Sequence, residues 1–85
     1  MSGENFQLLI SEEALKQLRA LPKDLRKRIG DRLSALETSF TGDVKKLAGT
    51  ENKYRLRVGN NRVLFRLAGN QIQVYAVKDR KEAYE

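Results

Sequence analysis

Alternation of apolar and basic residues in the second half of the chain is the feature that most narrows its fold. Residues 54–58 read Tyr-Arg-Leu-Arg-Val, and a period of two is typical of a strand with one buried face. Residues 59–61, Gly-Asn-Asn, have turn chemistry, because both residue types tolerate positive φ. A strand over 62–67, a turn at 69–70 and a last strand over 71–77 follow. The pattern predicts an antiparallel sheet.

Two-residue loops at Asn60-Asn61 and at Gly69-Asn70 predict which residues share a face of this sheet. One face is then apolar apart from a phenol: Tyr54, Leu56, Val58, Val63, Phe65, Leu67, Ile72, Val74 and Ala76. The other carries Arg55, Arg57, Arg62, Leu64, Arg66, Gln73, Tyr75 and Val77. Like charges in neighbouring cross-strand positions repel, so folding alone does not explain four arginines there. A bound phosphate backbone does, because guanidinium groups match phosphate oxygens bidentately.

The first half of the chain has helical periodicity. A short apolar strand over 6–10 precedes Ser11, a good N-cap for a helix over 12–20. After Pro22, apolar residues recur every three or four positions to Phe40, which predicts an amphipathic helix over 23–39. We therefore expect one α+β domain spanning residues 1–85, with a two-helix hairpin packed on the antiparallel sheet.

Composition excludes several kinds of chemistry. The sequence has no histidine and no cysteine, so catalysis through Ser-His-Asp, Cys-His or paired histidines is excluded, as is a cysteine-based metal site. The 17 basic and 11 acidic residues give a net charge of +6. All of that excess lies in residues 45–66, where seven basic residues accompany Glu51 alone. The charge suits a polyanionic partner.

No targeting or membrane segment is expected. The first ten residues lack the basic and apolar regions of a signal peptide. No apolar run approaches the roughly 18 residues of a membrane span. We expect a cytoplasmic protein with no membrane partner.

The order of these segments resembles the RelE/ParE toxin superfamily. The resemblance rests on Lys46-Leu47-Ala48-Gly49 leading into residues 54–65, YRLRVGNNRVLF, and on the ending at 74–84, VYAVKDRKEAY. Arg80, four residues before Tyr84, is similar to the RelE-type mRNA interferase branch. The resemblance covers essentially the whole chain.

The resemblance implies a type II toxin that a cognate antitoxin holds inactive in a hetero-oligomer. A freed RelE-like toxin enters the ribosomal A site, contacting rRNA, and cleaves mRNA there by attack of a ribose 2′-OH on the adjacent phosphate. It implies no metal and no cofactor. The active residues that it implies are Arg55, Arg57, Arg62, Arg80 and Tyr84.

Charge suggests roles for these residues. Arg62 and Arg80 are expected to clamp the pentacovalent phosphate as negative charge develops on it. Tyr84 would stack on a base or assist proton transfer. Arg55 and Arg57 stand where relatives often have lysine, and arginine does not lose its proton. The general base is then Tyr84, or proton transfer goes through RNA or water. Alternatively, Arg55 and Arg57 only bind the RNA. Asp79 also replaces a histidine that many relatives carry.

Further RNA-binding residues are expected around this set: Lys45, Lys46, Lys53, Arg66 and Tyr75. Plain structural alternatives stay open. Arg66 and Tyr75 are also common sheet-surface residues, Tyr84 would pack at a sheet edge, and the two neighbouring lysines would be loop charges. Tyr54 is expected to pack in the core.

Two other functions compete with a ribosome-dependent mRNA endoribonuclease. One is a ParE-like inhibitor of DNA gyrase, which shares the fold and has no nuclease site. The Arg80 to Tyr84 ending argues against it. The other is a binding module for RNA or antitoxin whose catalysis has decayed, an alternative that the arginines at 55 and 57 keep open.

Overall fold

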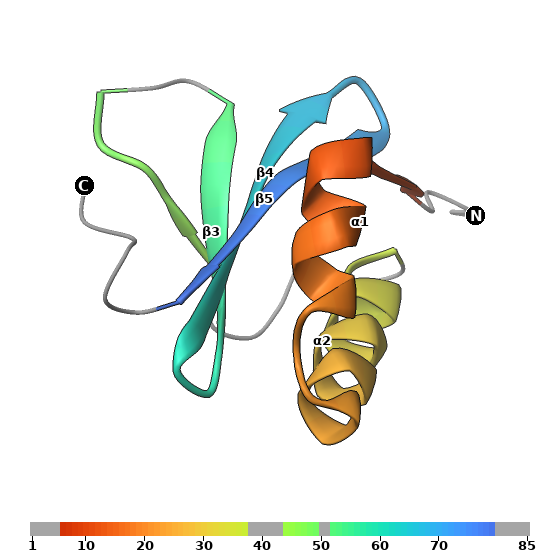
Figure 1. Ribbon diagram of the computed structural model, residues 1–85. Helices are drawn as coiled ribbons and strands as arrows, with labels where there is room; N and C mark the ends of the chain where they lie inside the picture. Colours follow the sequence, from red (N-terminus) through yellow and green to blue (C-terminus); the bar gives the residue numbers. More distant parts are fainter. Residues whose placement is uncertain (1–5, 38–43, 50–51, 80–85) are drawn as a thin grey trace.

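The computed structural model describes residues 6–37, 44–49 and 52–79 (Figure 1). These ranges contain two helices and five strands. In chain order they are β1 (Gln7–Ile10), α1 (Glu12–Arg19), α2 (Lys23–Leu36), β2 (Val44–Lys46), β3 (Lys53–Val58), β4 (Asn61–Ala68) and β5 (Gln71–Asp79).

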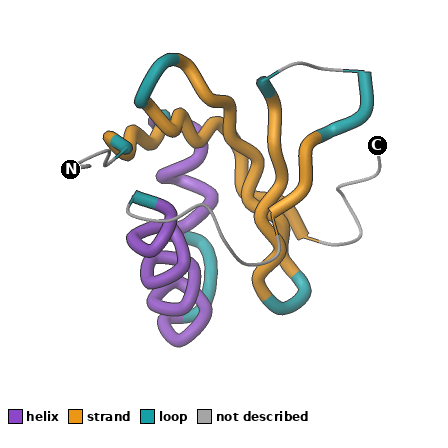
Figure 2. Tube along the Cα trace, turned by 180° about the vertical axis from the view of Figure 1, so that it is seen from behind, coloured by secondary structure: helices purple, strands orange, loops and turns teal. Residues whose placement is uncertain are grey.

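The five strands form one mixed sheet in the order β1-β5-β4-β3-β2. β1 runs parallel to β5, and the other neighbours are antiparallel. Figures 1 and 2 show both helices on one side of this sheet. The predicted α+β class is confirmed. The short strand β2 and the parallel pairing of β1 are additions that the sequence pattern did not predict.

The helices begin where their sequence signals place them. The Ser11 hydroxyl accepts a hydrogen bond from the Ala14 backbone N–H at 3.1 Å, which caps α1. α2 begins directly after Pro22 and ends at Leu36, so the predicted end at 39, together with Phe40, lies outside the described residues. Neither described helix is long and apolar enough to cross a membrane.

The core lies between the helices and one face of the sheet. Phe65 is fully buried, and Tyr54 stacks on it with ring centroids 5.6 Å apart and an interplanar angle of 13°. The predicted inward facing of Tyr54 is therefore confirmed. The buried cluster joins both helices to β3, β4 and β5: Ala14, Ile29, Leu33, Leu36, Leu56, Val58, Val63, Phe65, Ile72, Val74 and Val77.

The predicted loop of the β3–β4 hairpin was wrong by one position. Val58 pairs with Asn61, so the loop is Gly59-Asn60 rather than Asn60-Asn61. Gly59 has a φ of 60°, and no described non-glycine residue has a positive φ. A positive φ at the first loop residue only is typical of a type II′ turn, for which glycine is the natural first residue. The pairing changes by two residues, so every side chain keeps its predicted face.

A β-bulge in β5 corrects the prediction for the last strand. Phe65 pairs with Val74, but Leu64 pairs with Ala76, so the register of β5 against β4 shifts by one residue at Tyr75. The extra residue moves the following side chains to the other face. Val77 consequently joins the core, and Ala76 lies on the outer face with Leu64. The prediction had the opposite facing for both residues, because a bulge breaks the alternation on which it relied.

Candidate functional site

The side of the sheet opposite the helices carries a continuous set of basic side chains, here called the basic face. Its members are Lys45 of β2, Lys53, Arg55 and Arg57 of β3, Arg62 and Arg66 of β4, and Lys78 of β5. Direct cross-strand pairing places them on one side: Lys45 with Arg55, Lys53 with Arg66, Arg57 with Arg62, and Arg62 with Lys78. β2, β3 and β4 contain no acidic residue.

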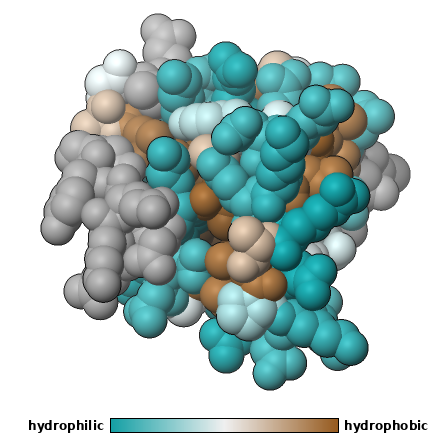
Figure 3. All heavy atoms as spheres, in the orientation of Figure 1, coloured by the Kyte–Doolittle hydropathy of each residue, from teal (hydrophilic) through white to brown (hydrophobic). Residues whose placement is uncertain are grey.

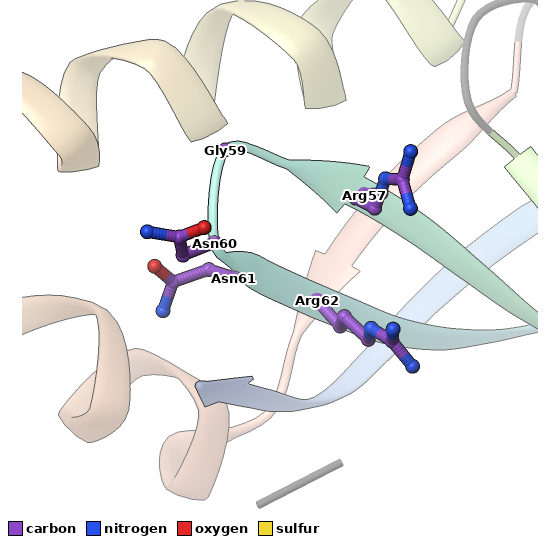
Figure 4. Close-up of a pocket in the computed structure, with 5 residues that line it drawn as sticks. All are labelled: Arg57, Gly59, Asn60, Asn61 and Arg62. Atoms are coloured by element: carbon purple, nitrogen blue, oxygen red, sulfur yellow. The ribbon is translucent and has the colours of Figure 1, made fainter. Parts of the chain in front are cut away.

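Arg57 and Arg62 occupy the end of the basic face beside the β3–β4 turn. Arg57 is exposed and Arg62 is half-buried. A shallow pocket of about 390 Å³ at this turn is lined by Arg57, Gly59, Asn60, Asn61 and Arg62. Figure 4 shows both arginine side chains directed away from the two asparagines at the tip of the hairpin. With two guanidinium groups and no carboxylate in its lining, the pocket suits an anion.

Lys78 is a member of this end that the sequence pattern missed. It lies opposite Arg62 on β5, where the prediction had Val77 opposite the arginine. The bulge at Tyr75 makes the difference, and strict alternation gives no sign of it. Three cationic residues on three adjacent strands therefore occupy neighbouring register positions at the turn end of the basic face.

The middle of the basic face combines charge with a small apolar patch. Arg55 is half-buried and pairs with Leu64 on one side and with Lys45 on the other. Leu64 and Ala76 are only 8% and 7% exposed, although they lie on the outer face. The middle therefore has two cations, Lys45 and Arg55, beside two apolar side chains.

At the other end of the basic face, two cations approach one aromatic ring. The Lys53 ammonium nitrogen lies 5.8 Å from the centre of the Tyr75 ring, and the Arg66 guanidinium carbon lies 5.9 Å from it. Both distances are within the range of cation–π attraction. The predicted RNA-binding residues Lys53, Arg66 and Tyr75 are thus brought together.

Other predicted site residues do not join this set. Lys46 pairs with Tyr54 and so lies on the helix side of the sheet, at its exposed edge. The role of Lys46 in RNA binding stays a prediction, and any such contact would lie on the other side of the sheet from the arginines. Arg80 and Tyr84 lie outside the described residues, and their roles stay predictions. Within the described ranges, no three acidic side chains come together as metal ligands would.

A side-chain hydrogen bond fixes the end of β5. β1 accompanies β5 only as far as Val74, and beyond that point the Gln17 side-chain oxygen accepts a hydrogen bond from the Val77 backbone N–H at 2.6 Å. This contact ties α1 to the strand segment that carries Lys78. It therefore supports the turn end of the basic face from the helix layer.

A second, apolar hollow lies between the helices and β1. Its volume is about 420 Å³, and its lining is Leu8, Ile10, Leu15, Leu18, Arg19, Arg26, Gly30, Leu33 and Ser34. Figure 3 shows apolar residues reaching the surface between groups of hydrophilic side chains. A hollow of this kind suits the apolar side of a partner helix better than a nucleic acid.

Comparison with known proteins decides the family. Residues 8–84 match the family model for the ParE toxin of the type II toxin–antitoxin system ParDE. The chain belongs to the RelE/ParE toxin superfamily. It is 32% identical to Toxin RelE3 of Methanocaldococcus jannaschii over 94% of this chain and 97% of that protein.

Solved structures agree with this membership. The RelE–RelB complex of Pyrococcus horikoshii superimposes with a TM-score of 0.80 at 29% identity, covering 93% of this chain and 99% of the other. The RelB–RelE complex of Methanococcus jannaschii gives a TM-score of 0.76 at 32% identity, covering 86% and 91%. The resemblance found in the sequence is confirmed, and the protein is a RelE-like toxin of the type II class.

Proposed function

We propose that this toxin is an endoribonuclease of the RelE type that cleaves mRNA in the A site of the ribosome. The observation that carries the proposal is the pairing of Arg57 with Arg62 across the β3–β4 hairpin, where both residues line a pocket at the turn. A toxin that acts on a phosphodiester needs fixed positive charge where the phosphate gains negative charge. The RelE names of its relatives support the same choice.

The proposed reaction is an internal transfer of the phosphate. The ribose 2′-oxygen attacks the adjacent phosphorus as its proton leaves, and the bond to the 5′-oxygen of the next nucleotide breaks. That oxygen takes up a proton, so the products are a 2′,3′-cyclic phosphate and a 5′-hydroxyl. Arg57 and Arg62 stabilise the pentacovalent phosphate, and Arg55 binds the strand beside them. Arg80 and Tyr84 remain proposed members of the site.

The proton acceptor explains why the ribosome belongs in the proposal. The sequence has no histidine or cysteine, and an arginine side chain offers hydrogen-bond donors but no proton acceptor. Proton transfer then depends on Tyr84, on water or on RNA groups. Ribosomal RNA would orient the mRNA for in-line attack, a contribution that reaches several kcal/mol in well-oriented reactions. Cleavage of free RNA should consequently be weak.

A cognate antitoxin is the second partner in this proposal. The related RelE proteins were solved as complexes with RelB. The apolar hollow between the helices and β1, flanked by Arg19 and Arg26, fits an amphipathic antitoxin helix with acidic residues at its edges. Such a complex would keep the toxin inactive in the cytoplasm, where translation takes place.

The test compares cleavage on and off the ribosome. Purified toxin is added to ribosomes stalled on a defined mRNA, and cut sites are mapped by primer extension. The same mRNA without ribosomes is the control. Cuts inside the A-site codon with little cutting of free mRNA are the expected result. Efficient cleavage of free RNA at physiological salt contradicts the proposed ribosome dependence.

Inhibition of DNA gyrase is the second candidate function. It is favoured by one observation, that the matching family model is the one for ParE toxins. A supercoiling assay with purified gyrase and the same toxin preparation separates the two candidates. Inhibited supercoiling with no RNA cut on ribosomes would select the ParE-like function.

A further inference from the structure

The end of the basic face farthest from the β3–β4 turn combines two cations with one aromatic ring. Lys53 and Arg66 are direct partners across β3 and β4. Both reach the ring of Tyr75 from β5, at 5.8 and 5.9 Å. Three adjacent strands thus contribute one side chain each to a compact group of two cations and an aromatic ring.

Folding stability does not account for this group. Like charges directly opposite each other on a sheet destabilise it. The Tyr75 ring offsets part of the repulsion, because its negative face attracts both cations. The ring reaches them from the bulge at Tyr75, and bulges commonly redirect a side chain near a functional site. The bulge therefore places the Tyr75 ring where it contacts both cations of the Lys53–Arg66 pair.

Spacing connects this group to the proposed cleavage site. Lys53–Arg66 and Arg57–Arg62 are two pairs in the same hairpin, four residues apart. At about 3.3 Å per residue, roughly 13 Å separates them along the strands. Arg55 lies midway, about 6.6 Å from either pair. The cations thus follow one line along β3 and β4, as they would to track the backbone of a single RNA strand.

We propose that Lys53, Arg66 and Tyr75 form a second RNA subsite, the distal subsite, which binds a phosphate of the same mRNA strand about 13 Å from the Arg57–Arg62 pair. This inference rests on the proposed function. Lys53 and Arg66 contact the phosphate oxygens. Tyr75 holds the two cations side by side, and since its ring already accepts both, it does not serve as a base-stacking platform.

The experiment removes single phosphate charges from an mRNA whose position the ribosome fixes. Stalled ribosomes carry an mRNA with 2′-O-methyl groups in the A-site codon, which block cleavage. One methylphosphonate, which is uncharged, replaces a phosphate at each position in turn. Affinity is measured for the parent toxin and for the Arg66→Ala, Lys53→Ala and Arg62→Ala variants. Lys27→Ala, on the exposed side of α2, is the control.

For the parent, we expect one position outside the cleavage site at which the methylphosphonate weakens binding about tenfold, the scale of one charge-assisted contact. Arg66→Ala and Lys53→Ala should weaken binding to the unmodified mRNA and lose sensitivity to that position. Arg62→Ala should lose sensitivity at a different phosphate. Tyr75→Phe keeps the ring and should match the parent, whereas Tyr75→Leu should weaken binding about threefold.

Contrary outcomes separate the inference from the function on which it rests. If Arg66→Ala binds like Lys27→Ala, or if its sensitivity is lost at the same phosphate as for Arg62→Ala, the distal subsite is overturned while the nuclease stands. If the parent toxin fails to cut an unmodified mRNA on the same ribosomes, the proposed function fails and the subsite with it. Arg66→Gln and thermal unfolding of every variant check that lost affinity does not reflect lost folding.

Discussion

Arg57 on β3 lies directly opposite Arg62 on β4, and the Gly59-Asn60 loop fixes that pairing. The two positions lie next to the turn, where a two-residue loop leaves the least freedom in register. Apolar pairs on the other face of the same strands, such as Leu56 with Val63, keep the two arginines opposite each other despite their repulsion. The packing of the core thus keeps two like charges on neighbouring strands, and a bound phosphate would reduce the repulsion between them.

The first prediction concerns the rate of cleavage. Arg62→Ala should lower single-turnover cleavage of mRNA on saturating ribosomes by about 10²–10³, the scale of losing one electrostatic donor at a transition state. Arg80→Ala should do the same, as the other member of the expected clamp. Arg66→Ala and Lys45→Ala should act mainly on the apparent KM and on its salt dependence. The measurement is quench-flow cleavage followed by primer extension.

Saturation is the control that gives this prediction its meaning. The ribosome concentration is raised until the rate of each variant reaches a plateau, so that weakened binding no longer contributes. A plateau for Arg62→Ala within about threefold of the parent is too small for a lost transition-state contact. We would then assign Arg62 to binding alone.

The second prediction tests whether the arginine at 57 limits proton transfer. Arg57→Lys keeps the positive charge at the turn end of the basic face and introduces a group able to give up a proton. Cleavage on ribosomes should be retained or increased, with the gain growing as pH rises, since more of the lysine is then deprotonated. A pH–rate profile of parent and variant between about pH 6 and 9 measures this. A fall in rate similar to that of Arg62→Ala would indicate that the bidentate shape of the guanidinium is what matters.

How far the sequence predicts this molecule depends on how local the signal is. The faces of Tyr54, Leu56 and Phe65 follow from alternation alone, and they are confirmed because a two-residue change in register leaves facing intact. The predicted loop position was wrong because Asn61 and Gly59 both have turn chemistry. Only the backbone φ shows which of the two residues lies in the loop.

The remaining differences come from tertiary structure. The bulge at Tyr75 has no sequence signature. It turns Val77 to the core face of the sheet and Ala76 to the outer face, and it places Lys78 opposite Arg62. Strand β2 is only three residues long, too short for a period to be recognised, so the opposite facing of Lys45 and Lys46 could not be predicted. The cation–π group at Tyr75 joins three strands and depends on the bulge. These features determine which further residues join the site. The alternation alone predicts that Arg55, Arg57, Arg62 and Arg66 share one face of the sheet.

The third prediction compares turn glycines. Gly59 and Gly69 have φ values of 60° and 62°, so alanine at either position should destabilise the protein by about 1–2 kcal/mol. A Cβ at Gly59 would also lie 3.3 Å from an Arg28 side-chain nitrogen, whereas one at Gly69 would meet nothing within 4 Å. Gly59→Ala should therefore cost as much as Gly69→Ala or slightly more. Urea unfolding followed by circular dichroism measures both.

A third glycine supplies a control of opposite sign. Gly30 lies inside α2, and a Cβ there would meet nothing within 4 Å. Gly30→Ala should stabilise the protein by about 0.5–1 kcal/mol, because alanine is the better helix former. Destabilisation by Gly30→Ala would mean that the hollow it lines is filled in the folded protein. Equal stability of Gly59→Ala and the parent would contradict the type II′ turn.

The fourth prediction concerns the contact between α1 and the end of β5. Gln17→Ala leaves the Val77 N–H without its acceptor in a partly buried position, which should cost about 1–3 kcal/mol. Gln17→Glu keeps an acceptor oxygen and should retain most of the stability at neutral pH. The matched control is Gln7→Ala, which removes an exposed 3.3 Å hydrogen bond from Gln71 and should change stability by less than about 0.5 kcal/mol. Amide hydrogen exchange at Val77, measured by NMR, should accelerate in Gln17→Ala and stay slow in Gln7→Ala. Equal protection of Val77 in all three variants would show that the strand end is held by packing alone, and Gln17 would then have no part in positioning Lys78 beside Arg62.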